Sequence, residues 1–154
     1  MKALTGIDNK KPLSFNGSKV HATEIPSISF VTTETEEFQG TMEFTGGGQF
    51  MVLFGDGNLS YISSGSNNLN HHYSGMGGTK KIQIIETVSA RFSDITKLEI
   101  SGQRAEGNIE NWPVAQMTAI ETFDISNCDF SGDLSGWATA LANWSNISLF
   151  YIYK

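Results

Sequence analysis

The feature that most constrains the fold of this chain is a repeat in its last third. Seven positions recur with an offset of 25 residues and carry side chains of the same kind in both copies. They are Ile95, Leu98, Ile100, Ser101, Gly107, Ile109 and Trp112 in the first copy, and Ile120, Phe123, Ile125, Ser126, Gly132, Leu134 and Trp137 in the second. A third copy begins at Ile147, with an offset of 27. A period of this length is typical of a solenoid in which each repeat adds one strand to a stack.

The spacing inside the copies, I-x-x-L-x-I and I-x-x-F-x-I followed by G-x-I or G-x-L, resembles that of the leucine-rich repeat. The resemblance covers about residues 94–154, which amounts to two repeats and the opening strand of a third. It implies that Cys128 fills a buried position whose side chain serves the turn backbone, where the first copy has Gln103. It also implies a parallel ladder, so we expect the strands at 98–100, 123–125 and 150–152 to be neighbours.

The return path between the ladder strands is expected to carry Trp112 and Trp137 stacked in register. A helical turn or two is expected within 113–119 and 137–142. A stack this short cannot bury its own ends. We therefore expect an open apolar edge near Phe150, covered either by a partner chain or by a continuation of the natural protein.

The chain before the repeat has β character. Residues 28–33 are rich in β-branched and aromatic side chains, and residues 38–45 alternate between apolar and polar ones. We expect Gly46-Gly47-Gly48 to break the second strand, and Gly55-Asp56-Gly57 to form the turn of a hairpin. The polar residues 63–70 are interpreted as an insert.

The order of motifs around that turn resembles the PKD-type immunoglobulin-like sandwich. The motifs are Leu53-Phe54-Gly55-Asp56-Gly57, His72-Tyr73, and Gly78-Thr79 leading into Ile82-x-Ile84. Phe54 stands where the family usually has Trp, and Lys80 where it usually has Tyr. The resemblance implies that His72 is packed near the turn and that His71 is exposed.

These patterns predict a mainly β protein of three parts. Residues 1–24 form an extended N-terminal arm. Residues 25–90 form a PKD/Ig-like antiparallel β-sandwich. Residues 91–154 form a short leucine-rich-repeat-like solenoid with a parallel strand ladder, packed against the sandwich.

Composition excludes several classes of partner. The net charge of −6 and the pI of 4.9 argue against nucleic acid, because phosphate binding needs clustered Lys and Arg. The single cysteine excludes an internal disulfide framework and a multi-thiolate zinc site. No stretch approaches the roughly 18 apolar residues of a membrane span, so we expect no membrane insertion.

We predict no catalytic, cofactor-binding or metal-ligating residues, and no cofactor. His71 and His72 are adjacent, so on a strand they point to opposite faces and cannot readily chelate one ion. Cys128 has no His or Asp at a catalytic spacing, and burial disfavours its thiolate. The Asp residues, among them Asp56 and Asp124, do not form a D-x-D-x-D-G calcium loop.

One surface remains as a candidate partner or ligand site. It combines ladder side chains that alternate with the core positions and the apolar end of the last strand. The residues are Lys97, Glu99, Thr122, Asp124, Leu149, Phe150, Tyr151 and Tyr153. Aromatic rings beside carboxylates suit contact with protein or glycan. The alternative is a solvated sheet face with an edge meant for assembly, which the concentration of aromatics at the end favours.

A PKD-like sandwich followed by leucine-rich repeats resembles modular surface proteins of Bacteroides-type gut bacteria and of their phages. Those bacterial proteins carry an export signal, and Met1–Asp8 has no apolar core of that kind. We therefore expect a non-enzymatic protein of the virion surface, a phage fibre or capsid-decorating subunit, that self-associates or binds another virion protein and contacts a host surface. The alternative is a bacterial cell-surface adhesin or glycan-binding module, and an enzyme is the weakest hypothesis.

Overall fold

The computed structural model describes residues 13–15, 18–20, 25–75, 77–87 and 89–152, and these residues form a mainly β structure. The strands of the first half are β1 (Leu13–Phe15), β2 (Ser18–Val20), β3 (Ser27–Thr32), β4 (Glu37–Phe38), β5 (Thr41–Leu53), β6 (Leu59–Asn68), β7 (His71–His72) and β8 (Lys80–Glu86). The second half contains β9 (Ile95–Glu99), β10 (Ala105–Asn108), β11 (Thr122–Asp124), β12 (Asp129–Ser131) and β13 (Leu149–Tyr151). Its helical turns are η1 (Phe92–Asp94), η2 (Val114–Gln116), η3 (Leu134–Gly136) and α1 (Trp137–Ala142).

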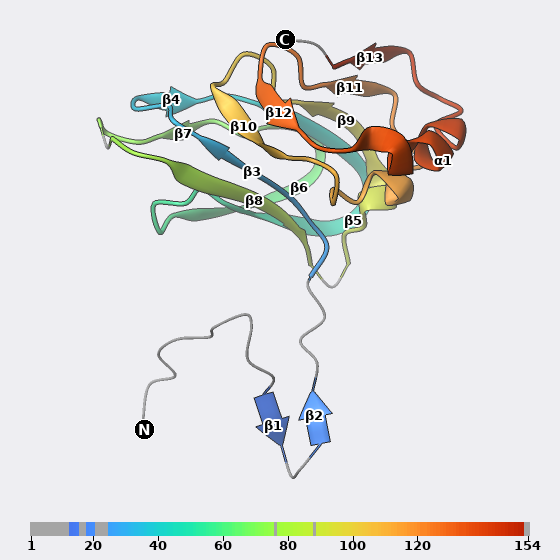
Figure 1. Ribbon diagram of the computed structural model, residues 1–154, viewed down its shortest axis with the longest axis horizontal. Coiled ribbons are helices and arrows are strands. Elements are labelled where there is room, and N and C mark those ends of the chain that lie inside the picture. The colour runs from blue at the N-terminus through green and yellow to red at the C-terminus, as the bar shows by residue number, and fades with distance from the viewer. Residues whose placement is uncertain (1–12, 16–17, 21–24, 76, 88, 153–154) are drawn as a thin grey trace.

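Nine of these strands form one curled, mixed sheet (Figure 1). Its order is β12-β10-β3-β8-β5-β9-β11-β13, with β6 paired to β5 in addition. Two small antiparallel sheets, β1-β2 and β4-β7, lie outside it. The β1-β2 pair is the described portion of the predicted arm; the other residues of 1–24 lie outside the described part of the chain.

The central strands β3, β8, β5 and β6 are antiparallel. Burial alternates along β3, β8 and the end of β5, so that Phe50 and Val52 are fully buried while Met51 between them is only half-buried. This is the period of a sheet with one face on the core. The hairpin between β5 and β6 closes at Gly55-Asp56-Gly57, as predicted, and both glycines have the positive φ that such a turn needs.

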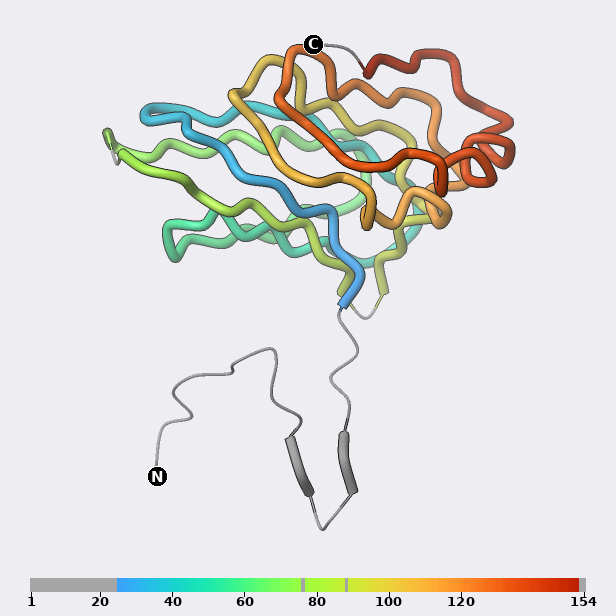
Figure 2. The backbone as a smooth tube through the Cα atoms, viewed as in Figure 1, coloured from blue at the N-terminus to red at the C-terminus, as the bar shows by residue number. Residues whose placement is uncertain are grey.

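The repeat places its strands in parallel pairs. Leu98 of β9 lies opposite Phe123 of β11, and Phe123 lies opposite Phe150 of β13. The predicted neighbours are therefore neighbours, in the register set by the offsets of 25 and 27 residues. A second parallel pair, which we did not predict, joins β10 to β12. Figure 2 follows these passes from yellow to red along one end of the molecule.

Both parallel ladders continue the antiparallel strands. β9 pairs with β5, and β10 pairs with β3, in each case antiparallel. The two strands of the first copy, β9 and β10, thus form backbone hydrogen bonds with strands that precede the repeat in the sequence. The two predicted units share one sheet rather than meeting only through side chains.

Two expectations for the first half are wrong. Gly46-Gly47-Gly48 does not break the strand: β5 runs through it with a bulge, because the register to β6 shifts between Phe44 and Gln49. Gly46 and Gly48 adopt positive φ there. The polar residues 63–70 are not an insert, since most of them belong to β6. A serine-rich edge strand has little apolar alternation, so the period that marks a half-buried strand is absent from it.

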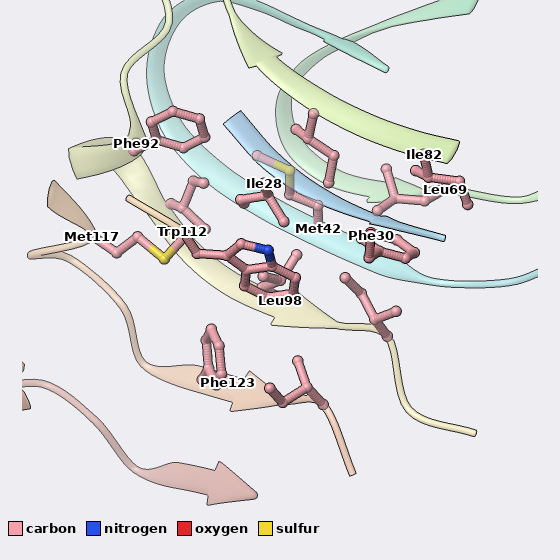
Figure 3. Packing of buried hydrophobic residues seen from close by; sticks show 14 of the residues in the cluster. Ile28, Phe30, Met42, Leu69, Ile82, Phe92, Leu98, Trp112, Met117 and Phe123 are labelled. Atoms are coloured by element: carbon pink, nitrogen blue, oxygen red, sulfur yellow. The ribbon is translucent and has the colours of Figure 1, made fainter. Parts of the chain in front are cut away.

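The buried side chains form a single cluster that runs from the central strands into the repeat (Figure 3). Phe123 has no exposed surface and contacts the rings of Trp112 at 6.5 Å and Trp137 at 5.9 Å. The predicted stacking of the two tryptophans on each other is wrong, because their ring contacts converge on Phe123 instead. The predicted helical turns are present as η2 and α1. Within the described residues, no helix is long and apolar enough to cross a membrane.

Candidate functional site

The ladder brings most of the predicted surface residues together. Lys97 lies opposite Thr122, and Thr122 opposite Leu149. Two residues further along the same strands, Glu99 lies opposite Asp124, and Asp124 lies opposite Tyr151. Directly opposed residues share a face of the sheet, so these six form two rows on one face. Tyr153 lies outside the described residues.

The charged members of this face are engaged locally. The Lys97 Nζ lies 2.9 Å from the Glu99 carboxylate. Asp124 accepts hydrogen bonds from the backbone N–H of Ser126 at 2.9 Å and from its hydroxyl at 2.6 Å. These side chains are half-buried. The charged side chains of the predicted surface therefore already have ion-pair or hydrogen-bond partners close by.

Phe150 differs from the other predicted surface residues, because its ring packs toward the core. It stacks on Phe123 at 5.8 Å and meets Trp144 edge-on at 5.8 Å. It is nevertheless 39% exposed, and Tyr151 next to it is 44% exposed. Within the described part of the chain, β13 ends the order of strands, so its outer edge faces no further strand.

At equivalent positions of the repeat, the last occurrence in the chain is more exposed than the earlier ones. Leu98 and Phe123 are fully buried, whereas Phe150 is 39% exposed. Ile109 is 2% exposed, whereas its counterpart Leu134 is 37% exposed. Each layer buries the one before it, and the described chain leaves the last layer uncovered.

Two leucines of this end were missed by the sequence analysis as surface residues. Leu134 and Leu141 are exposed, the first in η3 and the second in α1, which packs against η3. The repeat by itself predicted burial for Leu134, since its counterpart Ile109 is a core position. We call the set Leu134, Leu141, Phe150 and Tyr151, which come from η3, α1 and β13, the open end.

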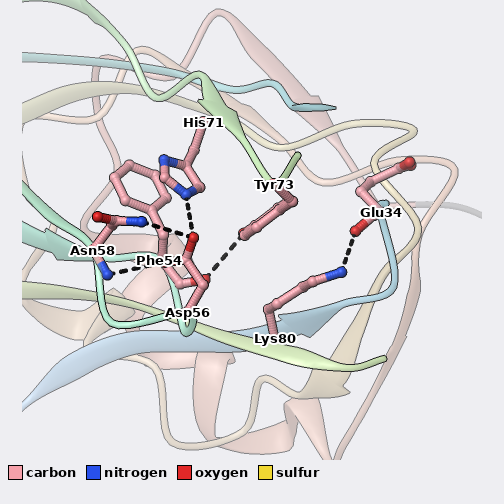
Figure 4. A network of polar contacts seen from close by, with 7 residues as sticks. All are labelled: Glu34, Phe54, Asp56, Asn58, His71, Tyr73 and Lys80. Atoms are coloured by element: carbon pink, nitrogen blue, oxygen red, sulfur yellow. Dashed lines mark hydrogen bonds and ion pairs between the residues drawn. The ribbon is translucent and has the colours of Figure 1, made fainter. Parts of the chain in front are cut away.

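A polar network surrounds the Gly-Asp-Gly turn (Figure 4). The Asp56 carboxylate lies 2.7 Å from His71 Nε2 and accepts two hydrogen bonds from Asn58. His71 also stacks on Phe54 at 4.2 Å, and the Tyr73 hydroxyl donates to the Phe54 carbonyl at 3.1 Å. The predicted assignment of the two histidines was thus inverted: His71 is packed, whereas His72 is exposed. A slip of one residue along a strand exchanges the two faces.

The protonation states in this network are set by burial and hydrogen bonding. Burial by itself raises the pKa of Asp56, but the hydrogen bonds from His71 and Asn58 outweigh it and hold that pKa well below its usual range. Burial raises the pKa of Tyr73 to about 12, with a smaller contribution from the nearby Asp56 charge. The tyrosine is therefore a neutral donor at physiological pH, and the network fastens the turn to the strand that follows it.

Cys128 is buried, as predicted, and its thiol donates to the Ile100 carbonyl at 3.1 Å. It also contacts the Ser126 carbonyl at 3.4 Å. Gln103, the equivalent residue of the first copy, donates to the equivalent carbonyl of Ser101 at 3.3 Å. Burial raises the pKa of the Cys128 thiol, although backbone N–H groups of Gln103, Gly102 and Ala105 oppose the shift. Both side chains serve the turn backbone.

A groove of about 860 Å³ lies along the outer side of β3 and β8, beside the segment after β10. Its polar side chains are Ser27, Ser29, Lys81, Gln83, Asn108, Asn111 and Gln116. None of its lining residues is a carboxylate, although the chain has 16 acidic residues. The Trp112 indole donates to the Ser29 carbonyl at 2.9 Å and closes one side.

The described residues contain no group of three or more His, Cys, Asp or Glu side chains that could hold a metal ion. Comparison with known proteins gives no match to a family model, to a curated protein or to a solved structure.

Proposed function

We propose that this chain is a non-enzymatic structural protein that works by assembly through its open end. The observation that carries the proposal is the unequal burial of equivalent positions, with Phe123 fully buried and Phe150 39% exposed one layer later. Four of the seven large apolar residues that are exposed in the described chain lie in this end. We take these four side chains to form one apolar surface, and a surface of that kind marks an interaction site.

In finer detail, we propose that the first half is a PKD/Ig-like sandwich and that residues 91–154 are a leucine-rich-repeat-like solenoid. The turn network around Asp56 and Tyr73 supports the first part, because it joins the motifs that carry the resemblance. The in-register pairs Leu98–Phe123 and Phe123–Phe150 support the second. With both resemblances, the setting we propose is a virion surface, where the protein acts as a fibre or capsid-decorating subunit.

Light scattering as a function of protein concentration tests the proposal. We expect the average mass to rise above 16.8 kDa in the micromolar range and Tyr151→Lys to restore the monomer. Tyr151 is 44% exposed, so a lysine there is accommodated without loss of the core. A wild-type protein that stays monomeric throughout would contradict the proposal.

The second candidate is a glycan-binding or adhesive module of a bacterial cell surface, and the groove beside β3 and β8 favours it. Amide and hydroxyl side chains such as Gln83, Asn111 and Ser27 are suited to hydrogen-bonding sugar hydroxyls. A glycan array distinguishes the two sites. Glycan binding that is lost in Gln83→Ala would support a module that acts through the groove. Glycan binding that is lost in Tyr151→Ala would support a module that acts through the open end.

A further inference from the structure

The strand β6 presents a second free edge. It pairs with β5, whose other side is occupied by β8 and β9, and within the described residues no strand lies on the outer side of β6. Leu59 and Tyr61 of this strand are 51% and 54% exposed. Residues 59–68 contain no charged side chain. Free edges are normally protected by charges, because their unpaired N–H and C=O groups can accept another strand.

Among the described residues, the large sheet has three free edges, on β6, β12 and β13, and they differ in charge. β12 begins with Asp129, and Asp133 follows two residues after its end. The strand β13 and Ser148, which precedes it, contain no charged side chain. Of the three edges, β6 and β13 are therefore the two that carry no charge of their own.

The apolar residues of β6 and β13 also alternate in the same way. On β6, Tyr61 lies opposite Met51 on the outer face, whereas Ile62 lies opposite the buried Phe50 on the core face. Leu59 lies opposite Leu53 and shares the outer face with Tyr61. Met51 in turn lies opposite Ile85 of β8, so an apolar row crosses three strands and stops at β6.

On β13, Phe150 packs on the core side against Phe123. Leu149 and Tyr151 therefore point to the outer face. A strand with the pattern of Leu149–Tyr151 placed beside β6 would continue the outer row with an apolar residue and set an aromatic ring beside Ile62. The two edges match each other in their lack of charge and in the Leu-x-Tyr pattern that each presents on the outer face, Leu59 and Tyr61 on β6 and Leu149 and Tyr151 on β13.

We propose that the outer edge of β13 of one copy adds to the outer edge of β6 of a second copy, extending the sheet from molecule to molecule. This inference rests on the proposed function and names the partner of the open end. Because the two edges are different surfaces, the contact is head-to-tail and leaves one edge of each kind unused at the ends of the assembly. It produces an open chain of subunits unless the rotation between copies closes a ring.

Sedimentation equilibrium of two variants and their mixture tests the pairing. Tyr61→Lys blocks the β6 edge and leaves β13 intact, whereas Tyr151→Lys blocks β13 and leaves β6 intact. We expect each variant alone to be monomeric and a 1:1 mixture to form a dimer that does not grow, since one productive junction remains. Thr79→Lys, which adds the same charge at an exposed position that belongs to neither β6 nor β13, should assemble like the wild type.

The outcomes separate this inference from the proposed function. If Tyr61→Lys assembles like the wild type while Tyr151→Lys does not, the open end binds something other than β6, and only the head-to-tail pairing is wrong. If neither variant changes the assembly of the wild type, or if the wild type is a monomer, both proposals are wrong. Circular dichroism of each variant confirms that the fold is retained before masses are compared.

Discussion

The ring of Phe150 is stacked on the ring of Phe123, with centroids 5.8 Å apart and an angle of 24° between the planes. The two residues are direct partners in the parallel ladder, yet Phe123 is completely buried and Phe150 is 39% exposed. Phe150 therefore covers a core residue while remaining uncovered itself. Phe150 thus belongs to the fold through its contact with Phe123, and its exposed part belongs to the surface that we propose as an assembly site.

The first prediction concerns the two stacked rings. Phe123→Ala should lower the free energy of unfolding by about 3–5 kcal/mol, since it removes a fully buried aromatic that contacts four other rings. Phe150→Ala should cost roughly 1–2 kcal/mol, because part of that ring is already in water. Urea denaturation at a concentration where the protein is monomeric measures both. Equal losses would contradict the unequal burial.

The second prediction concerns the glycine bulge in β5. Gly48 has a φ of +97°, and a Cβ there would lie 2.5 Å from the backbone carbon of Ser89. Gly48→Ala should therefore lower the free energy of unfolding by more than about 2 kcal/mol. Gly47→Ala is the matched control, because a Cβ at Gly47 meets nothing within 4 Å, and it should change stability by less than about 1 kcal/mol. Thermal unfolding of the two variants compares them directly.

The third prediction is a pH dependence. Because the folded-state pKa of Asp56 lies below its unfolded value of about 3.9, the ionised carboxylate stabilises the fold above that pH, and this stabilisation is lost as the pH falls toward the folded-state pKa. Asp56→Asn should cost about 1–3 kcal/mol at pH 7, and the difference from the wild type should shrink below pH 4. Urea unfolding between pH 7 and pH 2.5 measures it, with the exposed Glu110→Gln as control. A difference that does not change with pH would contradict this account of the network.

The fourth prediction concerns the thiol of Cys128. Since it is buried and its pKa is raised, it should react with a disulfide reagent at pH 8 at least tenfold more slowly in the folded protein than in urea. Cys128→Ser should also lower stability, because a more polar group replaces the thiol in the same buried space. Rapid labelling of the native protein would place the residue on the surface and contradict the repeat assignment.

The sequence predicted the strand pairing within the repeat better than it predicted the pairing of the repeat with the first half of the chain. The offset from Leu98 to Phe123 specified the ladder register, because equivalent positions of stacked repeats lie opposite each other. The pairing of β9 with β5 was not predictable in this way, since contacts between strands more than 40 residues apart leave no period in the chain. The strand β6 was missed for a related reason: an exposed edge of Ser and Asn has no apolar alternation to detect.

The surface was predicted in part. The alternation of the ladder placed Lys97, Glu99 and Asp124 on one face, but their local pairing depends on side-chain rotamers that no pattern specifies. The exposure of Leu141 depends on how α1 docks beside η3, which is a tertiary property. His71 and His72 were exchanged because the start of a two-residue strand cannot be fixed from the sequence to within one residue.

Hydrogen–deuterium exchange of the backbone amides of residues 149–151, recorded over a range of protein concentrations, tests the central claim most directly. If the last strand of the ladder is an assembly edge, these amides and those of residues 59–62 should become more protected as concentration rises, while the amides of β12 should not change. Protection at residues 149–151 that is independent of concentration would show that this edge does not recruit another copy of the chain.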